Sequence, residues 1–416
     1  MKDKTPSIRF KGFTDDWEQR KLSELATMHA RIGWQNLRTS EFLDVGDYML
    51  ITGTDFEDGK VNYSTCHYVE KERYDQDKNI QIKNGNILIT KDGTIGKVAY
   101  VEGLCLPATL NAGVFNVEIK DENETDSKYL FQFLKAPFLM DYVSKKATGG
   151  TIKHLNQNIL VDFPIATPSK AEQVRIGEYF SNLDNLITLH QRKYDQLLNI
   201  KKSMLEKMFP KNGKKAPEIR FDGFTDDWEQ RKLGELVEIG DIDHRMPETV
   251  ADGIPYLMTG DFVGTNELNF DGTKMISEED YCQLSQKIKP EKGDILFARY
   301  ASVGAARYVD FTRKFLISCS CAIIKKSKKI NSKYLYHFIT SDNAQQQIKL
   351  EINTGSQANI GISSMKNHIV VSMPPLGEQT KIADALSNLD HLITLHQRKL
   401  EKLQNLKISM LKQMFL

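Results

Sequence analysis

The chain has 416 residues, of which 40% are hydrophobic and 27% charged, and its formal net charge at pH 7 is +1. This length suffices for two to four domains. Because it has no apolar run of about 18 residues and no signal-peptide core after Met1, we expect no membrane span and no export. Five cysteines without a metal-like pairing pattern favour reduced thiols in the cytoplasm.

The sequence repeats itself at long range. Residues 12–22, Gly-Phe-Thr-Asp-Asp-Trp-Glu-Gln-Arg-Lys-Leu, recur unchanged as residues 223–233. A second block at residues 181–193 returns at residues 387–399 with one change. A repeat this long indicates two whole domains, because the units of a solenoid are roughly 20–50 residues long. The ends of each half are alike and the middles differ, so we expect one scaffold that presents two different recognition surfaces.

Each half opens with a turn signal, and a short helix is expected to follow from Trp17 and from Trp228. A later helix is expected at Ser127 and again at Ser332, with each serine as the N-cap. Between them, short apolar runs punctuated by glycines predict strands at residues 86–90, 98–101, 294–298 and 306–309.

Each half closes with a long helix, expected to begin near Glu172 and Glu378, just after prolines. Apolar residues spaced by four and three form matching seams in the two helices, at residues 183–208 and 389–414. Two matching seams on one chain are most simply buried against each other, as an antiparallel pair related by a twofold axis. A helix of about 26 residues spans roughly 39 Å, close to the roughly 34–36 Å of one turn of B-DNA.

Taken in order, these motifs resemble the specificity subunit of type I restriction-modification systems. Four features carry the resemblance, and each occurs twice: the opening Phe-x-Gly-Phe-Thr-Asp-Asp-Trp, the glycine-rich strand-turn, a Thr-Gly loop and a Glu-Gln pair at the start of the long helix. In the first half, the strand-turn covers residues 85–97, the loop begins at Thr148 and the pair is Glu172-Gln173.

The resemblance implies an α+β protein with two pseudo-twofold-related target-recognition domains joined by a long antiparallel helical coiled-coil pair. The expected parts are a first target-recognition domain at residues 1–168, a first helical spacer at 169–210, a linker with the second target-recognition domain at 211–373, and a second helical spacer at 374–416. Each domain would read one half of a split double-stranded DNA target, and the helices would set the unread gap.

The resemblance also implies partners. In this family the subunit has no catalysis of its own, and it binds two methyltransferase subunits and the restriction-translocase subunits. S-adenosylmethionine, ATP and Mg are expected on those partners, with no cofactor on this chain and no membrane contact. The expected docking residues lie at the ends of the long helices, where core packing is the alternative: Met204, Met208, Phe209, Met410, Met414 and Phe415.

Base edges in the major groove are read mainly by Arg, Lys, Asn and Gln, with help from Ser and Thr. We therefore expect DNA contacts from the glycine-rich turns and the Thr-Gly loops, at Lys91, Thr94, Lys97, Lys153, Arg299, Tyr300, Ser302, Gln357 and Asn359. The alternatives are a plain β-turn whose charges face water and a plain loop that links a helix to a strand. The repeated Trp17 and Trp228 are expected to anchor their domains in the core.

Two rival classes of function stay open at this point. Glu118 and Lys120, with Asp92 upstream, have the residue types of a metal-dependent nuclease, although Ile323 stands opposite Glu118 in the second half. No methyltransferase, dinucleotide-binding or P-loop motif is present. The other rival is a repeat scaffold that binds only protein, which the divergence of the two middles argues against.

Overall fold

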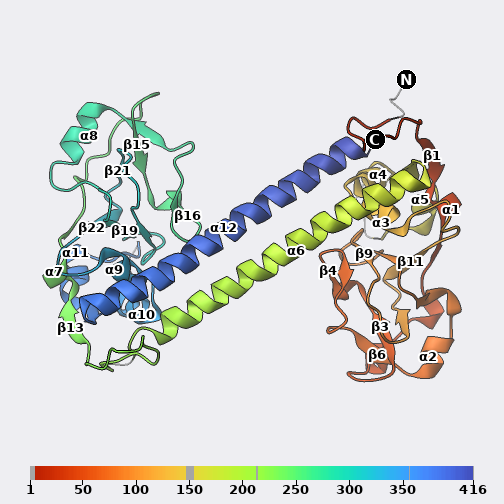
Figure 1. The fold of residues 1–416 in the computed structure, drawn as a ribbon, viewed down its shortest axis with the longest axis horizontal. Helices are drawn as coiled ribbons and strands as arrows, with labels where there is room; N and C mark the ends of the chain where they lie inside the picture. The colour runs from red at the N-terminus through yellow and green to blue at the C-terminus, as the bar shows by residue number, and fades with distance from the viewer. Residues whose placement is uncertain (1–4, 147–153, 212–213, 356, 416) are drawn as a thin grey trace. The chain divides into compact units, whose positions relative to one another are not determined.

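The computed structural model describes residues 5–146, 154–211, 214–355 and 357–415 (Figure 1). It divides into two compact units: Met1–His190 with Leu400–Leu416, called unit 1, and Gln191–Lys399, called unit 2. Two long helices, α6 (Lys170–Lys207) and α12 (Leu376–Met414), each contribute residues to both units. The predicted long helices are therefore confirmed, each beginning two residues before the expected glutamate.

A two-stranded antiparallel ladder opens each unit, where a helix was predicted. In unit 1, β1 (Glu18–Lys21) pairs with β12 (Pro164–Thr167), and in unit 2, β13 (Glu229–Lys232) pairs with β23 (Val370–Met373). Only the following turn is helical, as α1 (Leu22–Leu25) and α7 (Leu233–Leu236). The helix prediction failed at these strands because the partner strand lies more than a hundred residues away and leaves no local signal.

Unit 1 contains two larger sheets, with strand orders β6-β3-β10-β7 and β2-β11-β8-β9-β5-β4. Their strands are β2 (Ala26–His29), β3 (Tyr48–Ile51), β4 (Phe56–Glu57), β5 (Lys60–Val61), β6 (His67–Val69), β7 (Gln81–Ile82), β8 (Ile87–Thr90), β9 (Val98–Tyr100), β10 (Ala108–Leu110) and β11 (Val114–Ile119). The remaining α-helices of this unit are α2 (Lys71–Asp75), α3 (Ser127–Lys135), α4 (Phe138–Lys146) and α5 (Gln157–Val161).

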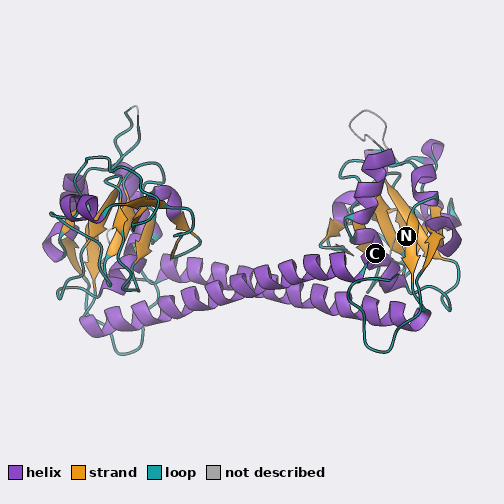
Figure 2. Cartoon of the chain, turned by 90° about the horizontal axis from the view of Figure 1, so that it is seen from above, coloured by secondary structure: helices purple, strands orange, loops and turns teal. Residues whose placement is uncertain are grey.

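Unit 2 has sheets with the orders β14-β22-β19-β20, β18-β15-β21 and β16-β17. Its strands are β14 (Ile239–Gly240), β15 (Ile254–Leu257), β16 (Phe262–Val263), β17 (Glu267–Leu268), β18 (Lys274–Ile276), β19 (Ile295–Ala298), β20 (Ala306–Tyr308), β21 (Leu316–Ile317) and β22 (Cys321–Ile324). Its other α-helices are α8 (Glu278–Leu284), α9 (Ser332–Ile339), α10 (Asp342–Leu350) and α11 (Ile362–His368). The four predicted strands are confirmed as β8, β9, β19 and β20. Figure 2 shows the strands of each unit in orange and the helices beside them in purple.

The serines predicted as N-caps are the first helical residues of α3 and α9. The caps are the residues before them: the Asp126 side chain accepts a hydrogen bond from the Tyr129 N–H at 2.8 Å, and the Asn331 side chain accepts from the Tyr334 N–H at 3.1 Å. Asp and Asn cap as well as Ser does. The caps are held in turn by the long helices, because the Asp126 N–H donates to the side chain of Gln173 at 2.9 Å.

The glutamate of each Glu-Gln motif fastens the long helix to the start of its domain. Glu172 accepts two hydrogen bonds from the Arg9 guanidinium, at 2.9 and 2.7 Å, and one from the Trp17 indole at 3.2 Å. In unit 2, Glu378 makes the same three contacts with Arg220 and Trp228. The bond to Glu172 raises the pKa of Arg9. Both tryptophans are buried, which confirms their predicted anchoring role.

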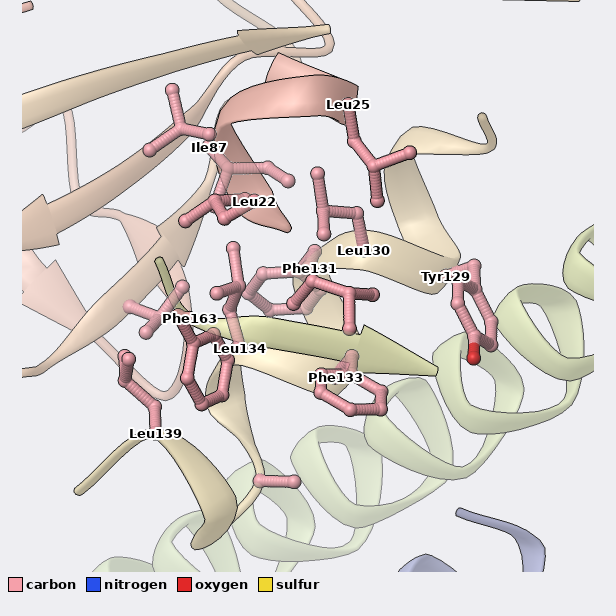
Figure 3. Close-up of a cluster of buried hydrophobic side chains, with 14 of the residues drawn as sticks. Leu22, Leu25, Ile87, Tyr129, Leu130, Phe131, Phe133, Leu134, Leu139 and Phe163 are labelled. Carbon is pink, nitrogen blue, oxygen red and sulfur yellow. The ribbon is translucent and has the colours of Figure 1, made fainter. Parts of the chain in front are cut away.

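The main core of unit 1 lies between α1, α3, β12 and the long helices. Figure 3 shows Leu22, Leu130, Phe133 and Phe163 packed together in it. The end of α12 completes this core, because Phe415 stacks on Phe180 of α6 with 5.5 Å between ring centroids. In unit 2, the end of α6 plays the same part, with Phe209 lying 5.6 Å from the Tyr334 ring.

The two long helices run in opposite directions within each unit. In unit 1, Phe180 faces Phe415, and four residues further along α6, Asp184 forms an ion pair with Lys407 at 2.5 Å. In unit 2, Lys201 forms an ion pair with Asp390. Asp390 follows Asp184 by 206 positions, and Lys407 follows Lys201 by the same number. The predicted α+β class and the antiparallel helix pairing are therefore confirmed in each unit, and both units have the same Asp–Lys pair between the helices.

Candidate nucleic-acid interface

The glycine-rich turn of unit 1 joins β8 to β9. Thr90, buried at the end of β8, holds this turn because its side chain donates to the Thr94 carbonyl and accepts from the Lys97 N–H at 2.9 Å. Gly93 and Gly96 have φ angles of 70° and 77°, which favour glycine. Thr94 and Lys97 are exposed, whereas the Lys91 ammonium lies 5.5 Å from the centre of the Phe115 ring.

The equivalent turn of unit 2 joins β19 to β20. Its ends are held by hydrogen bonds from the Ala298 N–H to the Ala305 carbonyl at 2.8 Å and from the Gly304 N–H to the Ala298 carbonyl at 3.1 Å. Ala301 stands where unit 1 has Gly93 and takes a positive φ of 57°. Ser302 is exposed and Tyr300 is half-buried. The two turns therefore share a backbone path and display different side chains.

In each unit the glycine-rich turn lies against the second predicted loop. The Leu155 N–H donates to the Lys91 carbonyl at 2.9 Å in unit 1, and the Ile360 N–H donates to the Arg299 carbonyl at 3.1 Å in unit 2. The sequence reasoning treated the turn and the loop as separate candidates. The structure brings them together, so that each unit has one surface made of two segments.

The side chains of the second loop differ between the units. In unit 1, His154 contacts Asp92 of the turn at 2.5 Å. In unit 2, Asn359 forms a β-bridge with Tyr300 and its side chain donates to the Gln357 carbonyl at 3.0 Å. Gln357 is exposed and Asn359 half-buried. The predicted contact Lys153 lies outside the described residues.

Arg299 is bound to the protein instead of presenting a free guanidinium. Its side chain is 8% exposed, its Nε donates to the Ile360 carbonyl at 3.0 Å, and its Nη1 forms an ion pair with Asp241. Burial and then the Asp241 carboxylate raise the pKa of the neighbouring Cys319 thiol. Sequence reasoning missed Asp241, because a single aspartate after a short strand has no distinctive pattern.

The predicted docking residues at the helix ends are mostly core residues. Met208 and Phe209 are buried in unit 2, and Met414 and Phe415 are buried in unit 1. Met204 and Met410 are partly buried against the same cores. This packing is the alternative that the sequence left open, and it leaves little of these side chains for a partner to touch.

The long helices instead expose other apolar residues, which the sequence reasoning did not single out. On α6 these are Leu186, Leu189 and Ile200, and on α12 they are Leu376, Leu392, Leu395, Leu406 and Ile408. Leu392, Leu395 and Leu406 follow the three α6 residues by 206 positions. The pairs Leu186–Leu189 and Leu392–Leu395 each lie about one helical turn apart, and adjacent exposed apolar residues can form an interaction surface. In the sequence, the pair Leu186 and Leu189 lies beside the first predicted seam and recurs as Leu392 and Leu395 beside the second; this pair could have indicated the surface.

The residues of the nuclease alternative lie apart. In the antiparallel pairing of β8 with β11, Thr90 faces Val114 and Ile87 faces Val117. Asp92 and Glu118 therefore extend from opposite ends of the ladder, about six residues or roughly 20 Å apart. The part of the chain that the structure describes contains no group of three or more His, Cys, Asp or Glu residues that could hold a metal ion.

Both halves of the chain match one family. The type I restriction modification DNA specificity domain matches residues 14–199 and residues 225–405. The chain belongs to this family. Among its described residues, this specificity-domain protein has no helix that is long and apolar enough to cross a membrane.

Several members resemble the chain over most of their length. It is 27% identical to the type I restriction enzyme MjaVIII specificity subunit of Methanocaldococcus jannaschii, over 79% of this chain and 78% of that protein. It is 26% identical to the putative type I restriction enzyme MjaX specificity subunit of the same organism, over 94% and 91%. The crystal structure of the type I restriction-modification S subunit from M. genitalium has the same fold, with a TM-score of 0.64 at 16% identity over 99% of both chains.

Proposed function

We propose that this chain is the DNA-recognition subunit of a type I restriction-modification complex, in which each unit reads one half of a split double-stranded target. The observation that carries the proposal is the two-segment surface, which recurs on an equivalent backbone frame with different polar side chains. Unit 1 has Lys91, Asp92 and His154 where unit 2 has Arg299, Tyr300 and Asn359. Different donors and acceptors on one frame are what two different half-sites require.

Within each surface, the exposed residues are the proposed DNA contacts. Thr94 and Lys97 project from the turn of unit 1, and Ser302 and Gln357 are exposed in unit 2. We assign Lys91, Tyr300 and Asn359 to the same surfaces as supporting contacts, and we propose Lys153, which lies outside the described residues, as a contact from its sequence alone. Side chains with few protein partners can rearrange around a base edge or a phosphate at little energetic cost.

The chemistry is assigned to partner subunits. Methylation of a base inside a duplex requires that the base be flipped out of the stack, and a recognition subunit contributes by fixing the register of the enzyme on the DNA. We propose that this chain has no catalytic activity, acts in the cytoplasm and binds two methyltransferase subunits and the restriction-translocase subunits. S-adenosylmethionine, ATP and Mg would then be held by those partners. The exposed leucines of α6 and α12 are the proposed docking surface for the methyltransferase.

The proposal is tested by expressing the chain with its neighbouring methyltransferase in a host without DNA methylation and by sequencing the methylated adenines. We expect two short half-sites separated by a fixed gap. Exchange of residues 23–165 for those of another family member should change one half-site and leave the other half-site and the gap unaltered. If the methyltransferase co-purifies with the chain and no site is methylated, the protein-binding scaffold replaces this proposal.

A further inference from the structure

We infer that Arg299 is a positioning residue, which joins the two recognition segments of unit 2 through Ile360, is anchored by Asp241 and does not itself read a base. Arginine is the residue most often found on guanine in the major groove, and its place in the turn suggests that role from sequence. The inference rests on the proposed function, because it assigns how one recognition surface is held in shape.

The contacts of Arg299 connect three separate segments of unit 2. Its backbone N–H donates to the Ser320 carbonyl at 2.9 Å, and its carbonyl accepts from the Ile360 N–H at 3.1 Å. Its Nε returns to the Ile360 carbonyl at 3.0 Å, and its Nη1 reaches Asp241, which follows β14. The residue thus ties the turn to the second loop on one side and to the end of β14 on the other.

The residues beside Arg299 and Ile360 are the ones that these contacts hold in position. Tyr300 and Asn359, one step from Arg299 and Ile360, form a β-bridge. The Gln345 side chain of α10 donates to the Gly304 carbonyl at 3.0 Å and so holds the far end of the turn. With Arg299 at one end and Gln345 at the other, the exposed Ser302 is presented at the tip of a turn fixed at both ends.

Burial decides between the two roles of Arg299. The side chains of Arg299 and Asp241 are 8% and 20% exposed. Without Asp241 the buried guanidinium would keep only the Ile360 carbonyl, whereas Asp241 without Arg299 would keep the exposed His244 at 3.0 Å. The Nε and Nη1 of Arg299 are held by the Ile360 carbonyl and Asp241, and little of the side chain is exposed for a base edge to approach. In unit 1 the ion pair at the turn is His154 with Asp92, at the positions of Asn359 and Tyr300; it is 71% and 41% exposed, and exposed pairs contribute little.

The experiment measures DNA binding by the full chain in complex with its methyltransferase. One probe is a duplex that carries the target sequence identified by its methylation. Each of the other probes carries one single-base change in the half-site that unit 2 reads. The variants are Arg299→Ala, Asp241→Asn and the double variant, and the control is Arg231→Ala. Arg231 forms an exposed ion pair with Glu235 at 3.6 Å in the same unit, away from the recognition surface.

For a positioning role, we expect Arg299→Ala and Asp241→Asn each to weaken binding of the intact target by about 10- to 100-fold, the range typical when a residue that orients a binding group is removed. The order of preference among the single-base changes should stay as in the wild type. The double variant should lose no more than either single variant, because both remove the same tie. Arg231→Ala should bind as the wild type does.

Loss of preference at one base pair in Arg299→Ala, with that preference kept in Asp241→Asn, would show that Arg299 reads the base and would overturn the inference. Wild-type binding by both variants would overturn it as well. Failure of the proposed function is distinguishable, because the wild-type complex would then be insensitive to every change in the unit 2 half-site. If Arg299→Ala does not fold, Asp241→Asn with Arg299→Lys gives the same comparison.

Discussion

The charge cluster between the long helices of unit 1 gives the sharpest test of how this fold is stabilised. Lys407 lies 2.5 Å from one oxygen of Asp184, and the other oxygen accepts from Gln132 at 2.8 Å and lies 3.4 Å from Lys135. The Lys407 and Asp184 side chains are only 11% and 16% exposed. Two cations therefore share one carboxylate, so the two possible single deletions are not equivalent.

The expected changes in the free energy of unfolding therefore differ between the two single variants. Burial, and then the charge of Lys135, lowers the pKa of Lys407 from 10.5 to about 8. At about 1.4 kcal/mol per pKa unit, holding Lys407 charged at pH 7 costs the folded chain on the order of 3 kcal/mol. Lys407→Met removes that cost and leaves Asp184 with Lys135 and Gln132, so its stability should stay within about 1 kcal/mol of the wild type or rise. Asp184→Asn leaves two cations without a carboxylate and should cost about 3–5 kcal/mol.

The assay is urea unfolding at pH 7 followed by tryptophan fluorescence, with the free energies of the variants compared at a common slope. Unit 2 supplies the control. Asp390 pairs with Lys201, Thr340 stands where unit 1 has Lys135, and burial keeps the pKa of the nearby His337 at about 3, so that this ring is neutral. Lys201→Met should therefore destabilise more than Lys407→Met. Equal losses in Lys407→Met and Asp184→Asn would refute the reasoning.

Three further outcomes follow from the same structure. Between pH 8 and 10.5 the unfolded chain binds the Lys407 proton more strongly than the folded chain does, so the contribution of this group to the free energy of unfolding increases with pH in that window. Lys407→Met should reduce this increase, which is measured by urea titrations at several pH values. Ala301→Gly should stabilise unit 2 by about 1 kcal/mol because it relieves a φ of 57°. Gly304→Ala should destabilise it, since Gly304 has a φ of 94°, which residues with a Cβ rarely adopt; calorimetry measures both. Leu189→Ser with Leu395→Ser should keep the urea midpoint and reduce co-purification of the methyltransferase, and a lowered midpoint would instead make these leucines structural.

The parts of the fold that sequence could predict are those with a local signal or an internal copy. The four strands beside the glycine-rich turns have runs of Ile, Leu, Val and Ala bounded by glycine, and the long helices have a seam of regular period. The antiparallel pairing followed from the copy itself, because two matching seams on one chain are most simply paired about a twofold axis; the structure shows the pairing in Asp184 with Lys407 and again in Asp390 with Lys201. A single half would have carried no such information.

The parts that sequence could not predict depend on contacts between distant residues. Residues near Glu18 were expected to form a helix and instead form β1, which pairs with β12. The local sequence around Glu18 does not indicate that Thr167 is its partner. The same holds for Arg299, whose residue type suggested base reading and whose partners, Asp241 and Ile360, lie about sixty residues away on either side. Residue type predicts what a side chain can do, and burial decides whether it is free to do it.

Comparison of the two units distinguishes residues that fasten each domain to its long helix from residues that differ between the recognition surfaces. Glu172 and Gln173 recur as Glu378 and Gln379 with the same partners, so the joint between domain and helix depends on side-chain identity. The contact that both units share between their recognition segments instead uses backbone atoms, from Leu155 to Lys91 in one unit and from Ile360 to Arg299 in the other; in unit 2 the Arg299 side chain adds a bond to the Ile360 carbonyl. The shared backbone contact survives a change of side chain, so the recognition surfaces can diverge while the joint to the helices stays constant. This arrangement is the physical reason to expect that an exchanged domain changes one half-site and leaves the gap unaltered.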